Sequence, residues 1–190
     1  MPGSERWAQV RPAWALPVTV AGDVVPVREG GVLVSVGAVC AYPVGFEFYL
    51  TIGFDLRQAA RRTTQGDGRR VLGFHARTPA EQASATRIVV GFASGATADS
   101  VACMGGKPTP GEPVLSFAGG DSMIGSYLPV LRAESRWWVS PLPPPGRIEF
   151  RVFLHGAAEP SGAASMDAAG ILAAASRSQA LWPAPSSGPW

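Results

Sequence analysis

Apolar and polar side chains alternate with a period of two over residues 46–56. The apolar members stand at every second position, namely Phe46, Phe48, Leu50, Ile52, Phe54 and Leu56. Between them lie mostly polar or small residues, among them Glu47 and Asp55. Because successive side chains of a strand point to opposite faces, this order predicts one apolar face and one mostly solvated face. Such a strand is typical of an antiparallel sheet covered on one side, since a strand buried on both faces is apolar throughout.

Further strands are predicted on both sides of this segment. Turn residues delimit short apolar runs at 16–20, 24–28, 32–42, 71–76, 87–93, 100–104, 114–117, 127–133, 136–140 and 147–155. In the segment 32–42, the residues expected to share one face are Val32, Val34, Val36, Ala38 and Cys40. The first two segments can pair as a hairpin across Ala21-Gly22-Asp23, and 100–104 is the candidate partner of 87–93.

The hydrophobic period changes near the C-terminus. Residues 167–180 are rich in alanine, which favours a helix, and Asp167 or Ser165 can cap it. Its apolar stripe is narrow and made of small residues, so we expect it to pack closely against a sheet or across the end of one.

The β signals at 114–117 and 127–133 are weaker than the others, and we expect eight to ten strands in all. Followed by one helix, they predict a mainly β protein. The fold that fits is an antiparallel two-sheet β-sandwich, jelly-roll or immunoglobulin-like, with one C-terminal helix; a closed barrel is the alternative. We expect an N-terminal arm over 1–15, a single domain over 16–182 and a tail over 183–190. A chain of 190 residues can bury a core of useful size without disulfides or a metal.

Charge and composition narrow the partners. The formal net charge is only +2, and no dense basic cluster interleaves with aromatic residues, so we expect no nucleic-acid partner. No apolar stretch of about eighteen residues predicts a membrane span. Cys40 and Cys103 lie in apolar stretches, which favours two buried thiols over a disulfide. The first residues lack the order of a signal peptide, so a cytoplasmic location is expected.

Catalytic and metal-binding motifs are missing from the sequence. His75 and His155 are the only histidines, and neither a zinc-ligand spacing, a Gly-x-Ser-x-Gly elbow nor a phosphate-binding loop occurs. We therefore predict no metal and no cofactor, assign no catalytic residue and lean against an enzyme. In a hydrolase-like enzyme whose site forms from distant loops, the first suspects would be His75, Glu47, Asp55 and His155.

Four residues are candidates for a binding site: Trp138, Glu47, Arg151 and His155. Trp137 shares the parity of Val139 and is predicted to be core, so Trp138 should point outward. Its indole is either covered, by the proline-rich segment 141–145, or a platform for a sugar or an apolar partner. Glu47 should lie on the solvated face and pair across strands with an arginine such as Arg151. His155 falls on the polar side of its strand.

Two sequence blocks carry a resemblance. Residues 42–48 (YPVGFEF) and 138–146 (WVSPLPPPG), followed by a strand and an Ala-rich helix that ends at Leu181-Trp182, resemble a family of uncharacterised actinobacterial proteins. The resemblance implies a bacterial, cytoplasmic setting and transfers no catalytic residue. The leading hypothesis from the residues is a non-catalytic module that binds or assembles with protein, including homo-oligomers formed through edge strands. The alternatives are the enzyme above and a small-ligand or carbohydrate-binding domain that uses Trp138.

Overall fold

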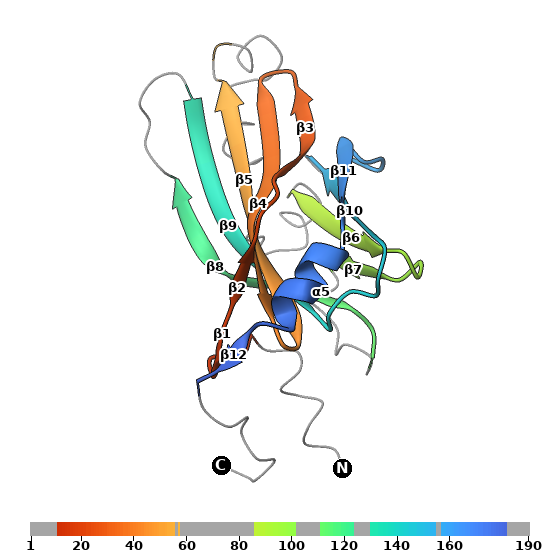
Figure 1. The fold of residues 1–190 in the computed structure, drawn as a ribbon. Helices are drawn as coiled ribbons and strands as arrows, with labels where there is room; N and C mark the ends of the chain where they lie inside the picture. The colour runs from red at the N-terminus through yellow and green to blue at the C-terminus, as the bar shows by residue number, and fades with distance from the viewer. Residues whose placement is uncertain are drawn as a thin grey trace.

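The computed structural model describes residues 11–55, 57, 86–101, 111–123, 130–154 and 157–181 of the chain. This part is built mainly from strands, with one helix (Figure 1). The elements are β1 (Ala15–Leu16), β2 (Val18–Val20), β3 (Val24–Glu29), β4 (Val32–Tyr42), β5 (Gly45–Asp55), β6 (Arg87–Phe92), β7 (Thr97–Asp99), β8 (Val114–Met123), β9 (Val130–Ser140), β10 (Arg147–Phe153), β11 (Gly162–Asp167), α5 (Ala169–Ala175) and β12 (Gln179–Ala180).

Two antiparallel sheets form the sandwich. The larger sheet has the order β2-β4-β5-β9-β8, with β3 also paired to β4, and the smaller one has the order β11-β10-β6-β7. Figure 1 shows the two sheets as separate layers, and neither closes into a barrel. The predicted antiparallel sandwich with a C-terminal helix is thereby confirmed, and the barrel alternative is wrong. A third, two-stranded ribbon joins β1 to β12 near the chain ends.

The core lies between the two sheets, where the alternating pattern predicts it. Phe48, Ile52, Phe150 and Val152 are completely buried. The rings of Phe48 and Phe150 meet edge to face across the two layers, with centroids 5.2 Å apart. Inward side chains of β5 and β10 therefore form the shared apolar interior, and the residues between them point to the outer faces.

A β-bulge in β4 corrects one predicted face. Val34 and Val36 point into the core, but the register shifts between Gly37 and Cys40, where Ala38 has a φ of 45°. An extra residue on one strand reverses the parity beyond it. Val39 and Ala41 consequently enter the core, while Ala38 is exposed and Cys40 is half-buried with a free thiol. The second cysteine, Cys103, lies outside the described residues.

Several strand boundaries and pairings also differ from the prediction. Segments β2 and β3 do not form a hairpin, because both pair with β4. The strand that pairs with β6 is β7 at 97–99, and of the predicted partner 100–104 only residues 100 and 101 are described. Residues 130–133 and 136–140, predicted in two segments, belong to the single strand β9, and 127–129 lie outside the described residues. The predicted strand 71–76 lies outside the described residues.

Helix α5 is shorter than the predicted 167–180. The N-cap residue is Ala168 and has no side-chain cap, while the Asp167 carboxylate one residue earlier accepts a hydrogen bond from the backbone N–H of Ala169 at 2.7 Å. The residues after α5 are not helical because they pair with another strand. β12 pairs with β1, and the Leu181 N–H donates to the Trp14 carbonyl at 2.7 Å. Before the helix, residues 162–167 form β11, an edge strand of the smaller sheet that was not predicted. The buried Ile171 and two alanines pack the helix against β2, β4 and β5.

Candidate functional site

The structure divides the predicted site residues between two opposite outer faces. Glu47 and Trp138 project from β5 and β9 on the outside of the larger sheet, and Arg151 projects from β10 on the outside of the smaller one. The predicted pairing of Glu47 with Arg151 is therefore wrong, because the core separates them. His155 lies outside the described residues, as does His75.

Glu47 is buried instead of solvated. It is 3% exposed, and its Oε2 accepts a hydrogen bond from Nη1 of Arg11 at 2.8 Å. This bond raises the pKa of Arg11 above its ordinary value. Arg11 lies in the segment predicted as an N-terminal arm, 36 residues from Glu47 in sequence, so a distant part of the chain supplies the charge that pairs with this carboxylate.

Trp138 lies directly beside Glu47 and is covered as well. The two residues are register partners on β9 and β5, and Trp138 is 1% exposed. The side chains packed in this cluster, which we call the arm cluster, are Trp14, Ala15, Cys40, Tyr42, Val44, Ala118 and Trp138. The outward direction and the cover of the indole agree with the prediction, but Leu142 of the proline-rich segment packs on the main core. With its indole buried, Trp138 is no exposed platform for a sugar or an apolar partner.

Gly45 makes room for the buried indole. A Cβ atom at this position would lie 2.6 Å from a ring carbon of Trp138 and 2.3 Å from the Val139 carbonyl oxygen. Tyr42, the register partner of Gly45, completes the seat with an edge-to-face contact to the indole at 5.4 Å between ring centroids. The Trp138 Nε1–H has no hydrogen-bond acceptor among the described residues.

The polar groups of the arm cluster are at least partly buried and are uncharged, which is typical of a structural contact. Burial raises the pKa of the Cys40 thiol, and burial followed by the charge of Glu47 raises the pKa of Tyr42, so both groups are neutral at pH 7. Asp55 stands eight residues beyond Glu47 on the same strand, which corresponds to roughly 27 Å. Of the residues suspected for an enzyme, the two that the structure describes therefore do not converge.

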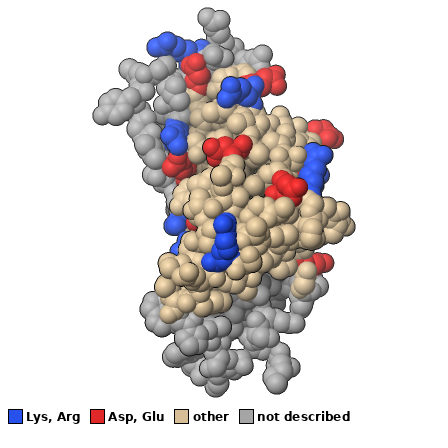
Figure 2. Space-filling model, viewed as in Figure 1, with Lys and Arg blue, Asp and Glu red and all other residues tan. Residues whose placement is uncertain are grey.

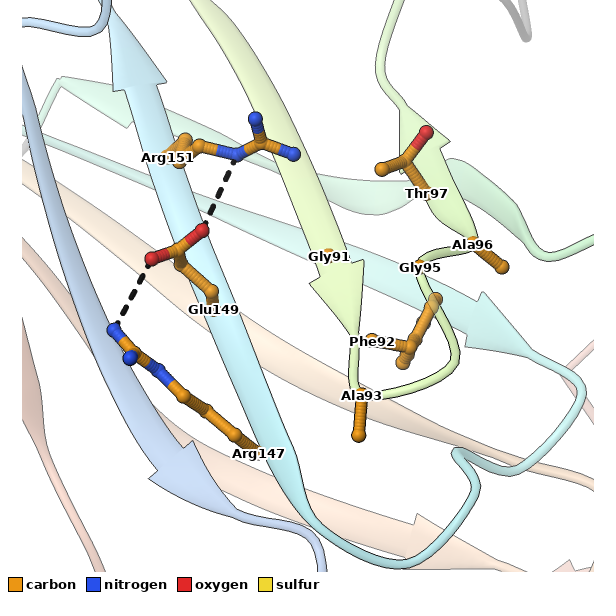
Figure 3. A pocket seen from close by; sticks show the side chains of 9 residues that line it. All are labelled: Gly91, Phe92, Ala93, Gly95, Ala96, Thr97, Arg147, Glu149 and Arg151. Atoms are coloured by element: carbon orange, nitrogen blue, oxygen red, sulfur yellow. Dashed lines mark hydrogen bonds and ion pairs between the residues drawn. The ribbon is translucent and has the colours of Figure 1, made fainter.

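An open cavity of about 240 Å³ occupies the outer face of the smaller sheet (Figure 3). Its lining comes from β10 and from the β6–β7 turn: Gly91, Phe92, Ala93, Gly95, Ala96, Thr97, Arg147, Glu149 and Arg151. We call this cavity with its three charged side chains the ladder pocket. Arg151, one of the predicted binding residues, is part of it.

Glu149 lies between the two arginines of the ladder pocket, as Figure 3 shows. Its Oε1 accepts a hydrogen bond from Nη2 of Arg147 at 3.1 Å, and its Oε2 lies 3.6 Å from Nε of Arg151. The second distance permits an ion pair but is too long for a hydrogen bond, so Nε of Arg151 has no hydrogen-bond acceptor among the described residues. The side chains of Arg147 and Glu149 are 67% and 35% exposed.

Gly91 gives the ladder pocket its depth. Gly91 lies on β6, where it is the register partner of Glu149 on β10 and of Thr97 on β7. Because it is a glycine, β6 has no side chain at this level of the outer face. A Cβ atom at Gly91 would come to 3.4 Å from Nη2 of Arg151, which places the guanidinium above this glycine. The outward parity of the three charged residues was readable from the sequence. The pocket was not, because it depends on which strands pair with β10.

Next to the ladder pocket, the charged side chains of the smaller sheet are paired with one another. Arg87 forms an ion pair with Asp99, which raises the pKa of Arg87, and its guanidinium lies 4.8 Å from the ring centroid of Phe153. These side chains satisfy one another. In the view of Figure 2, basic and acidic residues stand singly or in small groups among uncharged ones.

No family model, curated protein or solved structure matches the chain. Within the described ranges, no group of three or more His, Cys, Asp or Glu side chains is arranged to hold a metal ion. The helical part of those ranges offers no segment of sufficient length and hydrophobicity to cross a bilayer.

Proposed function

We propose that the protein is a non-catalytic protein-binding module whose recognition site is the ladder pocket. The observation that carries the proposal is a contrast between the two outer faces. The buried carboxylate of Glu47 is already paired with Arg11, whereas Arg151 lines an open cavity, keeps a third of its side chain exposed and has a long 3.6 Å ion pair with Glu149. Arginine is among the residues enriched at protein interfaces, because its planar fork binds carboxylates and carbonyls in defined directions.

The size of the cavity supports a protein partner over a free metabolite. Pockets for small molecules usually measure about 300–1,000 Å³ and enclose most of the ligand. The ladder pocket, at about 240 Å³, lies below that range and is open to solvent. A cavity of this kind accommodates one protruding side chain while the surrounding sheet face supports the rest of a partner.

The test is capture of binding proteins with matched variants. The double variant Arg147→Gln/Arg151→Gln removes both pocket cations. Arg132→Gln is the control, because Arg132 pairs with Glu134 two residues along β9 just as Arg147 pairs with Glu149 along β10. A protein retained by the wild type and the control, lost with the double variant and then bound by the purified wild type in calorimetry supports the proposal. If the double variant retains the same proteins as the wild type, the proposal is wrong.

A further inference from the structure

We infer that the ladder pocket recognises a carboxylate, the side chain of an aspartate or glutamate on an exposed segment of a partner protein. This inference rests on the proposed function and adds the chemistry of the group that is bound. It is carried by the charge, the donors and the walls of the pocket.

The charge of the pocket fits a monoanion. Arg147 and Arg151 flank the single acid Glu149, so the ladder has a formal charge of +1. One incoming carboxylate would neutralise it. A phosphate group carries a charge of about −1.5 to −2 at pH 7, and it would meet additional repulsion from Glu149 inside a site of this size. The local balance of charge therefore favours a carboxylate.

The donors of Arg151 are available for such a group. Guanidinium has five N–H donors, and the Nε–H of Arg151 is buried 3.6 Å from the Glu149 carboxylate. The donors left for a ligand are therefore those on the two Nη atoms, of which Nη2 lies above Gly91. Arg147 keeps two-thirds of its side chain exposed while it donates to the same carboxylate. The two arginines stand four residues apart on one strand, one on each side of Glu149, and can donate to an anion placed beside Glu149, over Gly91.

The walls of the pocket suit the stem of an acidic side chain. The side contributed by the β6–β7 turn is lined by the small residues Ala93, Gly95 and Ala96, and the Ala96 side chain itself packs on the main core. The methylene carbons of a glutamate can pack there while its carboxylate reaches the arginines. A glutamate of the partner would thus place its carboxylate against the charged residues of β10 and its methylene groups against the small residues of the β6–β7 turn.

Glu149 competes with an external carboxylate for the two arginines. The inference therefore predicts affinity changes of opposite direction for substitutions of the acid and of an arginine. Glu149→Gln removes the resident charge and should tighten the binding of an external carboxylate, whereas Arg151→Gln should weaken it. A ladder that served only to hold β10 in place would give no such opposite pair of effects.

The experiment is a nuclear magnetic resonance titration that follows the side-chain Nε–Hε signal of Arg151. The probe is a blocked Ala-Glu-Ala tripeptide, with blocked Ala-Gln-Ala and inorganic phosphate as separate arms. We expect saturable binding of the Glu peptide in the millimolar range. Because the Arg151 signal is absent from Arg151→Gln, backbone amide shifts of Gly91 and Thr97 report its affinity, which should fall at least tenfold. Glu149→Gln should bind about three- to tenfold more tightly, and Arg132→Gln should equal the wild type.

Gly91→Ala provides a second variant that leaves every charge in place. Its added methyl group occupies the floor of the pocket, so the affinity for the Glu peptide should fall several-fold. Equal shifts with the Gln peptide, tighter binding of phosphate, or weaker binding by Glu149→Gln would each overturn the inference. Pocket-dependent capture of a protein without any carboxylate effect would overturn this inference alone, whereas carboxylate binding without pocket-dependent capture would overturn the proposed function.

Discussion

The outer faces of the two sheets start from the same pattern and end in different states. In β5 and β10 alike, a glutamate stands between inward-facing apolar residues and points away from the core. Glu47 is 3% exposed and bonded to Arg11 from a distant segment, whereas the side chain of Glu149 is 35% exposed and bonded to neighbours on its own strand. The parity of a residue therefore decides its face, but a separate part of the chain decides whether that face meets solvent.

The difference also separates stability from recognition. The arm cluster fills the space over its sheet with an indole, a phenol ring and the arm itself, so its residues are expected to contribute to folding. The ladder pocket leaves a cavity, and its side chains are exposed enough that their removal should hardly change the fold. Substitutions on the face of the arm cluster should thus lower stability, whereas substitutions in the ladder pocket should lower binding.

The largest effect is expected for Trp138→Ala. Replacing a fully buried large aromatic residue by alanine usually costs about 3–5 kcal/mol of unfolding free energy. The matched substitution on the other face, Arg147→Ala, should change it by no more than about 0.5 kcal/mol, since that side chain is 67% exposed. Urea unfolding of both variants checks the comparison. Similar losses in the two variants would contradict the assignment of the arm cluster to stability.

A pair of glycines sharpens the same contrast with one identical change. In Gly45→Ala, the new Cβ atom would lie 2.3 Å from a backbone oxygen, so the seat of Trp138 must move, at a cost of about 1–3 kcal/mol. In Gly91→Ala, the nearest neighbour of the new Cβ atom is Nη2 of Arg151 at 3.4 Å, and stability should change by less than about 0.5 kcal/mol. Thermal unfolding measures both. A stable Gly45→Ala variant would show that the indole does not need this glycine.

The third effect concerns the arm. Arg11→Ala leaves the buried Glu47 without its cation, but because Arg11 itself is 41% exposed we expect a loss of only about 1–2 kcal/mol. The arm should also loosen, since its anchor on the sheet is gone. Hydrogen exchange of the Leu181 N–H, which donates to the Trp14 carbonyl, should then become faster than in Arg147→Ala. Unchanged exchange would mean that the arm cluster holds without the ion pair.

The sequence predicted the faces of the sheets better than their surroundings. Alternation placed Phe48, Ile52 and Phe150 in the core correctly, because a period of two is a local property of an extended chain. It failed for Val39 and Cys40, where the bulge at Ala38 inverts the order and no simple residue pattern announces the inversion. It also failed for residues 176–180, where pairing of β12 with β1 ends a segment of high helical propensity.

The candidate site was predictable only in part, for a related physical reason. Arg151 and Glu149 could be placed on an outer face from their own strand, but the cavity exists because Gly91 and the β6–β7 turn lie beside them. Glu47 was assigned to a solvated face, but it is buried and paired with Arg11, 36 residues away. The outer face of Trp138 was predicted correctly, but its cover includes the distant Trp14, and Leu142 of the proline-rich segment packs elsewhere. Strand neighbours and long-range cover are tertiary facts that alternation does not encode.

The smallest effect is a loss of stability at alkaline pH that is caused by two residues of the arm cluster, Cys40 and Tyr42. Cys40 and Tyr42 have pKa values raised above 9.0 and 10.0, chiefly by burial, so the folded state holds their protons more tightly than the unfolded state does. Their contribution to stability is therefore complete below pH 9 and declines as the pH rises through 9 to 10 and beyond. In Cys40→Ala the decline should be shallower from pH 9, and in Tyr42→Phe from pH 10, while Arg151→Gln should follow the wild type. Unfolding free energies measured at intervals from pH 7 to 11 test this, and identical slopes in all four proteins would show that these two groups meet solvent as freely as the residues of the ladder pocket.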